Sequence, residues 1–116
     1  MLKDNIIRLR HMLDAAREAL SFSKNKTRND LDSDRMLALS IIKSIEIIGE
    51  AASTVTKEFC DTHSEIPWAN IVAMRNRLIH AYYDIDLDRV WDTITDDLPP
   101  LVSALEKVIS QESNES

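Results

Sequence analysis

The chain of 116 residues contains a single glycine, Gly49. Nucleotide-binding motifs of the Rossmann and P-loop kinds need several glycines close together, so neither can be present. β-Sandwiches and barrels need many tight turns with positive φ, which one glycine and a few asparagines supply poorly. With 44% apolar residues and a formal net charge of −6, the chain is typical of a globular protein rather than a disordered one. We therefore predict an all-α fold, an antiparallel bundle of four or five helices.

The cysteine content and the ends of the chain narrow its setting. Cys60 is the single cysteine, so an intramolecular disulfide is impossible and we expect a reducing, cytoplasmic location. Because Cys60 ends an apolar pattern, we interpret it as a packing residue. We expect no signal peptide and no membrane span. The prediction is one domain over residues 1–110 and a polar, disordered tail over residues 111–116.

Apolar residues at three- and four-residue spacing predict two amphipathic helices in the first half of the chain. The first spans about residues 2–20 and the second about residues 33–59. The polar stretch 21–32 is predicted to be a loop between them. Asp32 or Ser33 can cap the second helix.

Gly49 falls in the middle of the second predicted helix. Glycine in a helix interior costs roughly 1 kcal/mol relative to alanine. An isolated glycine that is kept at such a position indicates a tight packing contact. We predict that another backbone approaches closely there.

The second half of the chain predicts shorter helices separated by proline and aspartate. Pro67 suits the first position of a helix that runs to about residue 82. Asp86 can cap the next helix. The Pro99-Pro100 pair then produces either a kink or the start of a fifth helix, and the sequence leaves both open.

Arg75 stands in the middle of the apolar face of the helix that follows Pro67. With about 100° per residue, six apolar or aromatic residues lie within roughly 60° of it: Trp68, Ile71, Val72, Leu78, Ile79 and Tyr82. A buried charge is costly unless it is paired, and such local conflicts are typical of functional sites. An internal ion pair with Glu46 or Glu50 explains the pattern equally well.

Asn76 and His80 are four residues apart on another face of that helix, beside Ala69 and Ala73. This small, polar strip suits close approach by another helix, such as one from a second copy of the chain. Arg75 and His80 lie roughly 140° apart. They would therefore act together only across a groove, for example one that a second subunit closes. A lone histidine near a helix end is more often a cap or a surface group than a catalyst.

Other candidate sites carry weaker signals. His11 and His63 have no partners at metal-ligand spacing, so we predict no zinc site. No Gly-x-Ser-x-Gly elbow is present. We interpret the acids of the last third as caps and solvated turns, although they leave a loose magnesium site open: Asp84, Asp86, Asp88, Asp96 and Asp97.

Residues 75–82 form a motif that resembles a known family. They read Arg75-Asn76-Arg77-Leu78-Ile79-His80-Ala81-Tyr82, that is arginine, four residues, histidine, one residue and tyrosine. This resembles the motif of HepT-like toxins in the HEPN superfamily. Residues 47–51, 66–68 and 84–100 are also similar to that family's pattern, and the resemblance covers roughly residues 1–110.

The resemblance implies a symmetric, all-helical homodimer with a metal-independent endoribonuclease site in the cleft between the subunits and no cofactor. Arg75 and His80 would be catalytic there, and Asn76 would support them. Attack of an RNA 2′-OH on the adjacent phosphate would give a 2′,3′-cyclic phosphate and a 5′-OH. Histidine can move the protons near neutral pH, and a guanidinium can bind the phosphate.

The resemblance also implies a partner, a small nucleotidyltransferase antitoxin of the MNT type. That enzyme would use ATP to attach AMP to Tyr82, and the bulky, charged group would keep RNA out of the groove. Tyr83 turns toward the His80 side of the helix and is, with Glu50, a supporting candidate.

The sequence is also consistent with two functions other than a toxin ribonuclease. The chain would be a non-catalytic helical partner, or a nucleotide-binding subunit, of a nucleotidyltransferase if Arg75 binds a nucleotide. It would be a structural dimer if Arg75 only pairs with Glu50.

Overall fold

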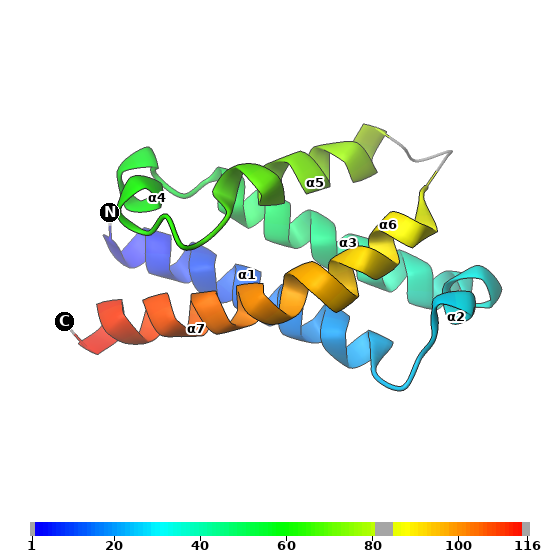
Figure 1. Ribbon diagram of the computed structural model, residues 1–116. Helices are drawn as coiled ribbons and strands as arrows, with labels where there is room; N and C mark the ends of the chain where they lie inside the picture. The colour runs from blue at the N-terminus through cyan, green and yellow to red at the C-terminus, as the bar shows by residue number, and fades with distance from the viewer. Residues whose placement is uncertain (1, 81–84, 115–116) are drawn as a thin grey trace.

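The long helices pack as an antiparallel bundle (Figure 1). The computed structural model describes residues 2–80 and 85–114, and the side chains of residues 77–80 and 113–114 lie outside that description. Four long helices carry the fold: α1 (Leu2–Ser23), α3 (Arg35–Ser53), α5 (Trp68–His80) and α7 (Leu98–Asn114). Since the described residues contain no strand, the predicted all-α class is confirmed.

The helices form two layers around one main core. α1 packs against α3, α5 packs on α3, and α7 packs on α1. The fully buried side chains between them come mainly from positions three or four residues apart, which is the amphipathic pattern seen in the sequence: Leu9, Met12, Ile48, Leu98, Leu105 and Val108. Small residues on α1, such as Ala16 and Ala19, are also buried and let α1 lie close to its neighbours.

The predicted loop over residues 21–32 is confirmed only at residues 24–27, because α1 runs to Ser23 and α2 (Arg28–Ser33) forms after them. The Asp30 carboxylate accepts from the backbone N–H of Thr27 at 2.7 Å, which is half of a capping box. Leu31 is only 2% exposed and packs with Ile41, Ile45 and other residues of a second core cluster. One buried leucine is too short a signal for a periodicity analysis to detect.

The predicted single helix over residues 33–59 is also wrong, because the chain breaks between α3 and α4 (Lys57–Thr62). Thr56 caps α4 by accepting from the backbone N–H of Phe59. The buried Asn5 of α1 accepts from the backbone N–H of Thr56 at 3.1 Å and donates to its hydroxyl at 3.0 Å. This tertiary contact stabilises a break that the continuous apolar pattern conceals.

The start of α3 differs by one or two residues from the prediction. Asp34, rather than Asp32 or Ser33, is the N-cap, and its carboxylate accepts from the backbone N–H of Leu37 at 3.1 Å. The predicted cap of the later helix is confirmed, since Asp86 accepts from the backbone N–H of Arg89 at the start of α6 (Leu87–Asp92). Pro67 lies directly before α5 rather than at its first position.

The Pro99-Pro100 pair lies in the first turn of α7 and does not interrupt the helical path. The turn before it is the π-helical segment η1 (Thr93–Asp97), in which the backbone N–H of Leu98 bonds the carbonyl of Thr93. Two successive prolines donate no backbone hydrogen bonds and crowd the preceding turn, so the local i→i−4 pattern cannot form there. α7 continues to Asn114, so the described part of the expected disordered tail is helical.

Candidate active site

Arg75 of α5 lies directly against Gly49 of α3. A Cβ built on Gly49 would stand 2.8 Å from Cγ and 3.0 Å from Cδ of Arg75, and closer still to its Cβ. These atoms belong to the base of the side chain, which cannot swing away without moving α5. The predicted close approach at Gly49 is therefore present, but the neighbour is the stem of Arg75 and not a second backbone.

The guanidinium of Arg75 is held in a defined orientation. Nε and Nη2 donate to Oδ1 of Asn76 at 3.1 and 2.8 Å, and Nη1 donates to Oε2 of Glu50 at 2.8 Å. The planar fork is thus oriented by one residue of its own helix and one of α3, which is the preorganisation that a guanidinium needs to bind a phosphate.

The ion pair predicted as the alternative for Arg75 is present, and Glu50 is the partner. The Arg75 side chain is 19% exposed, while Glu50 is 71% exposed. An ion pair with one carboxylate so open to water contributes little to stability, at most about 1 kcal/mol. The pair therefore orients Arg75 at the protein surface and does not seal it in the interior.

Of the other motif residues, the structure describes the side chain of Asn76 but not those of His80 and Tyr82. Asn76 is exposed, and on the same side of α5 Ala69 is exposed and Ala73 half-buried. His80 is the last residue of α5, and its side chain lies outside the described part of the chain. Tyr82 and Tyr83 lie outside the described residues altogether.

An exposed apolar stripe on α3 leads to the arginine. Met36, Leu39 and Ile47 are 80%, 42% and 38% exposed. They share one side of the helix with the exposed Lys43 and with Glu50, because residues three, four and seven apart lie close together on a helix surface. The sequence prediction considered only the buried face of this helix. The same helical spacing would also have predicted this exposed stripe.

His63 is a structural residue. It is 7% exposed, its Nε2 lies 2.8 Å from Oε1 of Glu112, and its ring lies 4.5 Å from that of Phe59. Glu112 is 49 residues away in the sequence, so no local pattern could predict this pairing. The contact ties the end of α7 to the connection before α5.

Cys60 is half-buried, and burial followed by the charge of Asp61 raises the pKa of its thiol. This disfavours the thiolate that a nucleophile requires. Cys60 packs against the main core, as its interpretation as a packing residue predicted. In the described residues, no group of three or more histidine, cysteine or acidic side chains is arranged to hold a metal ion.

Comparison with known proteins identifies a family that the chain matches over most of its length. The family model described as "Ribonuclease HepT-like" matches residues 12–108. A relative from Caldanaerobacter subterraneus subsp. tengcongensis named "Putative RNase" is 33% identical over 104 residues, which are 90% of this chain and 93% of the relative. A relative from Thermococcus cleftensis named "Probable ribonuclease HepT" is 36% identical over 95 residues, 78% of this chain and 86% of the relative. No solved structure matches the chain significantly.

None of the described helices combines the length and the apolar character that crossing a bilayer requires.

Proposed function

Because the chain belongs to the HepT-like ribonuclease family, we propose that it is a metal-independent endoribonuclease, the toxin of a toxin–antitoxin pair whose antitoxin is an MNT-type nucleotidyltransferase. In this proposal the active form is a homodimer in the cytoplasm, RNA is the substrate, and Arg75 and His80 are the catalytic residues. ATP takes part only through the antitoxin.

The orientation of Arg75 is the observation that carries the proposal. Its stem is held by Gly49, and its fork is held by Asn76 and Glu50 at the surface. Since the pair with the exposed Glu50 contributes at most about 1 kcal/mol, stability alone does not account for an arginine at this position. A phosphate of RNA can take the place of the Glu50 carboxylate, because both present oxygens to the same planar fork.

The proposed reaction needs a base, an acid and a group that stabilises negative charge. A histidine imidazole accepts the proton of the RNA 2′-OH as that oxygen attacks the adjacent phosphorus. Arg75 stabilises the charge that builds on the phosphoryl oxygens. The P–O5′ bond breaks, and a protonated imidazole gives its proton to the leaving oxygen. The products are a 2′,3′-cyclic phosphate and a 5′-OH.

A two-fold dimer would supply both the acid and the base. Arg75 and His80 are roughly 140° apart on one helix, so one subunit does not present both side chains on a single face. The exposed stripe of Met36, Leu39 and Ile47 runs up to Glu50, beside Arg75. We propose that this stripe and the strip around Asn76 pack on the same surfaces of a second copy, which would bring two Arg75 and two His80 into one cleft.

Cleavage of a defined RNA in the presence of a chelator tests the proposal. Arg75→Ala and His80→Ala are each expected to lower the cleavage rate by at least about a hundredfold, the lower end of a lost general acid–base or oxyanion contact. Arg17→Ala is the matched control, because Arg17 is an exposed arginine of α1 that is also paired with one carboxylate, that of Glu106. Parental rates in either motif variant, or the same loss in the control, would refute the assignment.

The proposed AMP acceptor needs a separate test. After co-expression with the nucleotidyltransferase, the intact mass of the protein is expected to rise by one or more AMP units. The added mass should vanish in Tyr82→Phe and persist in Tyr83→Phe. An unmodified parental protein, or an unchanged mass gain in Tyr82→Phe, would contradict modification at this residue.

A second candidate is a non-catalytic, nucleotide-binding partner of a nucleotidyltransferase. The hydrogen bond between Arg75 and the Glu50 carboxylate favours this second candidate, because it shows that the guanidinium is positioned to bind a single anionic group. Under this candidate the purified chain binds nucleotide through Arg75 and co-purifies with the enzyme. It cleaves no RNA, and any cleavage by a contaminating nuclease is unaffected by His80→Ala.

A further inference from the structure

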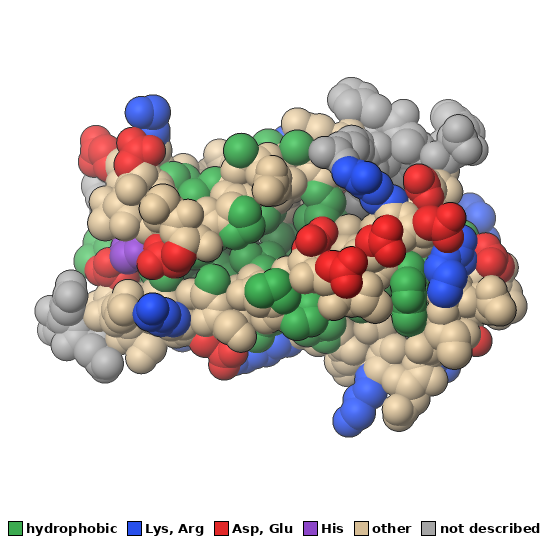
Figure 2. Space-filling model, in the orientation of Figure 1, with side chains coloured by type: hydrophobic (Ala, Val, Ile, Leu, Met, Phe, Trp, Pro, Cys, Tyr) green, Lys and Arg blue, Asp and Glu red, His purple; other side chains and the backbone are tan. Residues whose placement is uncertain are grey.

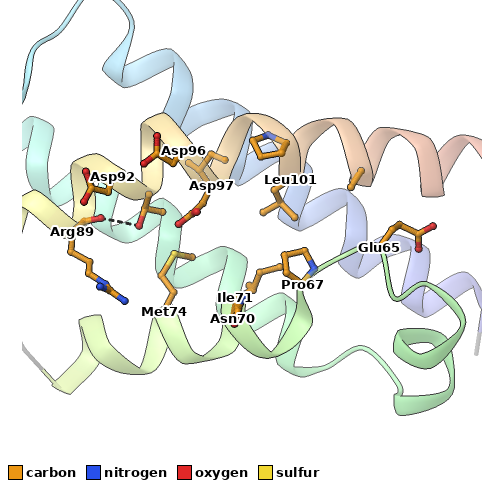
Figure 3. A pocket seen from close by; sticks show the side chains of 14 residues that line it. Glu65, Pro67, Asn70, Ile71, Met74, Arg89, Asp92, Asp96, Asp97 and Leu101 are labelled. Atoms are coloured by element: carbon orange, nitrogen blue, oxygen red, sulfur yellow. Dashed lines mark hydrogen bonds between the residues drawn. The ribbon is translucent and has the colours of Figure 1, made fainter.

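A groove of about 610 Å³ separates α5 from η1 and α7 (Figure 3). It exists because α5 packs on α3 whereas α7 packs on α1, so the two helices diverge at the front of the molecule (Figure 1). Ile71, Leu98 and Leu101 are almost fully buried and belong to the floor. Met74 and Pro67 line the α5 side.

The rim of this groove is acidic. Asp92, Asp96, Asp97 and Glu65 line it, and among the lining side chains that the structure describes Arg89 is the one basic residue. Figure 2 shows the acidic side chains gathered along one edge of the apolar surface. Partial burial raises the pKa of the Asp97 carboxyl, Asp96 and Asp92 raise it further, and Arg89 lowers it. The carboxylates therefore repel one another more than the nearby arginine compensates.

The groove is separate from the proposed catalytic face. Met74 points toward the space between the helices (Figure 3), whereas Asn76 is about 160° away around α5. The acidic rim repels the phosphates of RNA. Among the described residues, these acids do not form a group that could hold a metal ion. A second copy of the chain is a poor occupant, since in a two-fold contact its own acidic rim would face this one.

We infer that this groove docks a basic, amphipathic helix of a partner protein. An apolar floor between two helical walls fits side chains at positions i, i+3 and i+4 of a bound helix. Asp92 and Asp96 are one helical turn apart, so they match lysines or arginines one turn apart on the flank of that helix. The inference does not depend on the proposed nuclease activity, because the two surfaces share no residue.

Titration with a synthetic helical peptide tests the inference. The probe has leucine on one face and lysine on both flanks, and a matched peptide has glutamate in place of lysine. Isothermal titration calorimetry is expected to show binding of the lysine peptide that weakens with salt, and no binding of the glutamate peptide. In amide NMR spectra, the shifts should concentrate at Asn70, Met74 and Ala104 and spare Gly49 and Asn76.

Variants of the groove separate charge from apolar contact. Asp92→Lys with Asp96→Lys should weaken peptide binding at least about tenfold, as expected when attractive charge pairs at the rim become repulsive. Ala104→Phe should weaken it by filling the floor without a change of charge. The control is Glu58→Lys with Asp61→Lys on α4, two exposed acids away from the groove. Circular dichroism melts establish that each variant is folded.

Each outcome decides the inference. Equal binding by the groove variant and the control variant would overturn it, as would shifts centred on Asn76 or a change in oligomeric state caused by the groove substitutions. Tighter binding of single-stranded RNA to the groove variants than to the control variant, with no peptide binding by the parent, would also overturn it. The groove variants should cleave RNA at the parental rate, so a failed docking test and a failed nuclease test are distinguishable.

Discussion

At the scale of single residues, the candidate site depends on a contact between Gly49 and Arg75 that lies across two helices. The glycine is needed for space and not for an unusual backbone angle, since its φ is not positive. Without a side chain at that point, α5 lies close enough to α3 for Glu50 to reach the guanidinium. The lack of a side chain at Gly49 on the neighbouring helix therefore determines where Arg75 lies.

Gly49→Ala is expected to destabilise the protein. Overpacking usually costs about 1–3 kcal/mol, although alanine favours a helix by roughly 1 kcal/mol over glycine. The measurement is the free energy of unfolding from urea titration. Gly49→Ala should cost much less in an Arg75→Gly background than in an Arg75→Ala background, because alanine keeps the Cβ atom nearest to the new methyl group. A Gly49→Ala protein of parental stability would contradict the contact.

Asp97 has a predictable pH dependence. Its folded-state pKa is raised, first by partial burial and then by Asp96 and Asp92, so the folded protein binds this proton more tightly than the unfolded chain. The stabilisation that the protonated Asp97 carboxyl contributes is fully present below the ordinary aspartate pKa of about 3.9. It is lost as the pH rises through the folded-state pKa. Asp97→Asn should therefore raise Tm at neutral pH.

The same variant should show no gain in Tm below about pH 3.9, where Asp97 is protonated in both states. Thermal melts followed by circular dichroism at the two pH values provide the comparison. A lower Tm at neutral pH, or an equal gain at both pH values, would show that the carboxylate is not under the strain inferred for it.

At the scale of secondary-structure elements, the break between α3 and α4 is fixed from α1. Val55 and Phe59 continue the apolar period of α3 and both are buried, so the pattern does not signal a break. The amide of Asn5 pairs with the N–H and the hydroxyl of Thr56, and these two bonds hold the turn that starts α4. The same turn sets the path toward α5 and hence the position of Arg75.

Asn5→Ala should lower the free energy of unfolding by about 1–3 kcal/mol, because it leaves the polar groups of the half-buried Thr56 without their buried partner. Asn29→Ala serves as the control, since Asn29 is exposed on α2 and its loss should change stability by less than about 0.5 kcal/mol. Chemical denaturation of both variants is the measurement. Equal effects would mean that the Asn5 contact does not stabilise the break.

At the scale of the whole molecule, α5 separates two surfaces of different character. On one side lie the oriented arginine, Asn76 and the apolar stripe of α3. On the other side lies the acidic groove along η1 and α7. This division would let the protein meet an anionic substrate and a basic partner at once, without competition between them.

Ile47→Lys is expected to dissociate the proposed dimer, because it adds a second charge next to Lys43, at the end of the stripe nearest to Glu50. Sedimentation velocity should show at least about a tenfold weaker association, with loss of RNA cleavage at concentrations where the parent is dimeric. Phe22→Lys is the matched control, since Phe22 is 40% exposed and lies on α1 rather than on α3. A dimeric and active Ile47→Lys protein would refute this interface.

The sequence by itself determined the helical class, the caps at Asp86 and close to Asp34, and Arg75 with Asn76 as the residues to examine. Each of these depends on neighbours within about one turn of helix, where spacing and residue type are sufficient. The tertiary structure decided the break held by Asn5, the partner of Arg75 among two acids, the pairing of His63 with Glu112, and the groove. These features join residues that are far apart in the chain, and only the packing of the helices determines which of them meet.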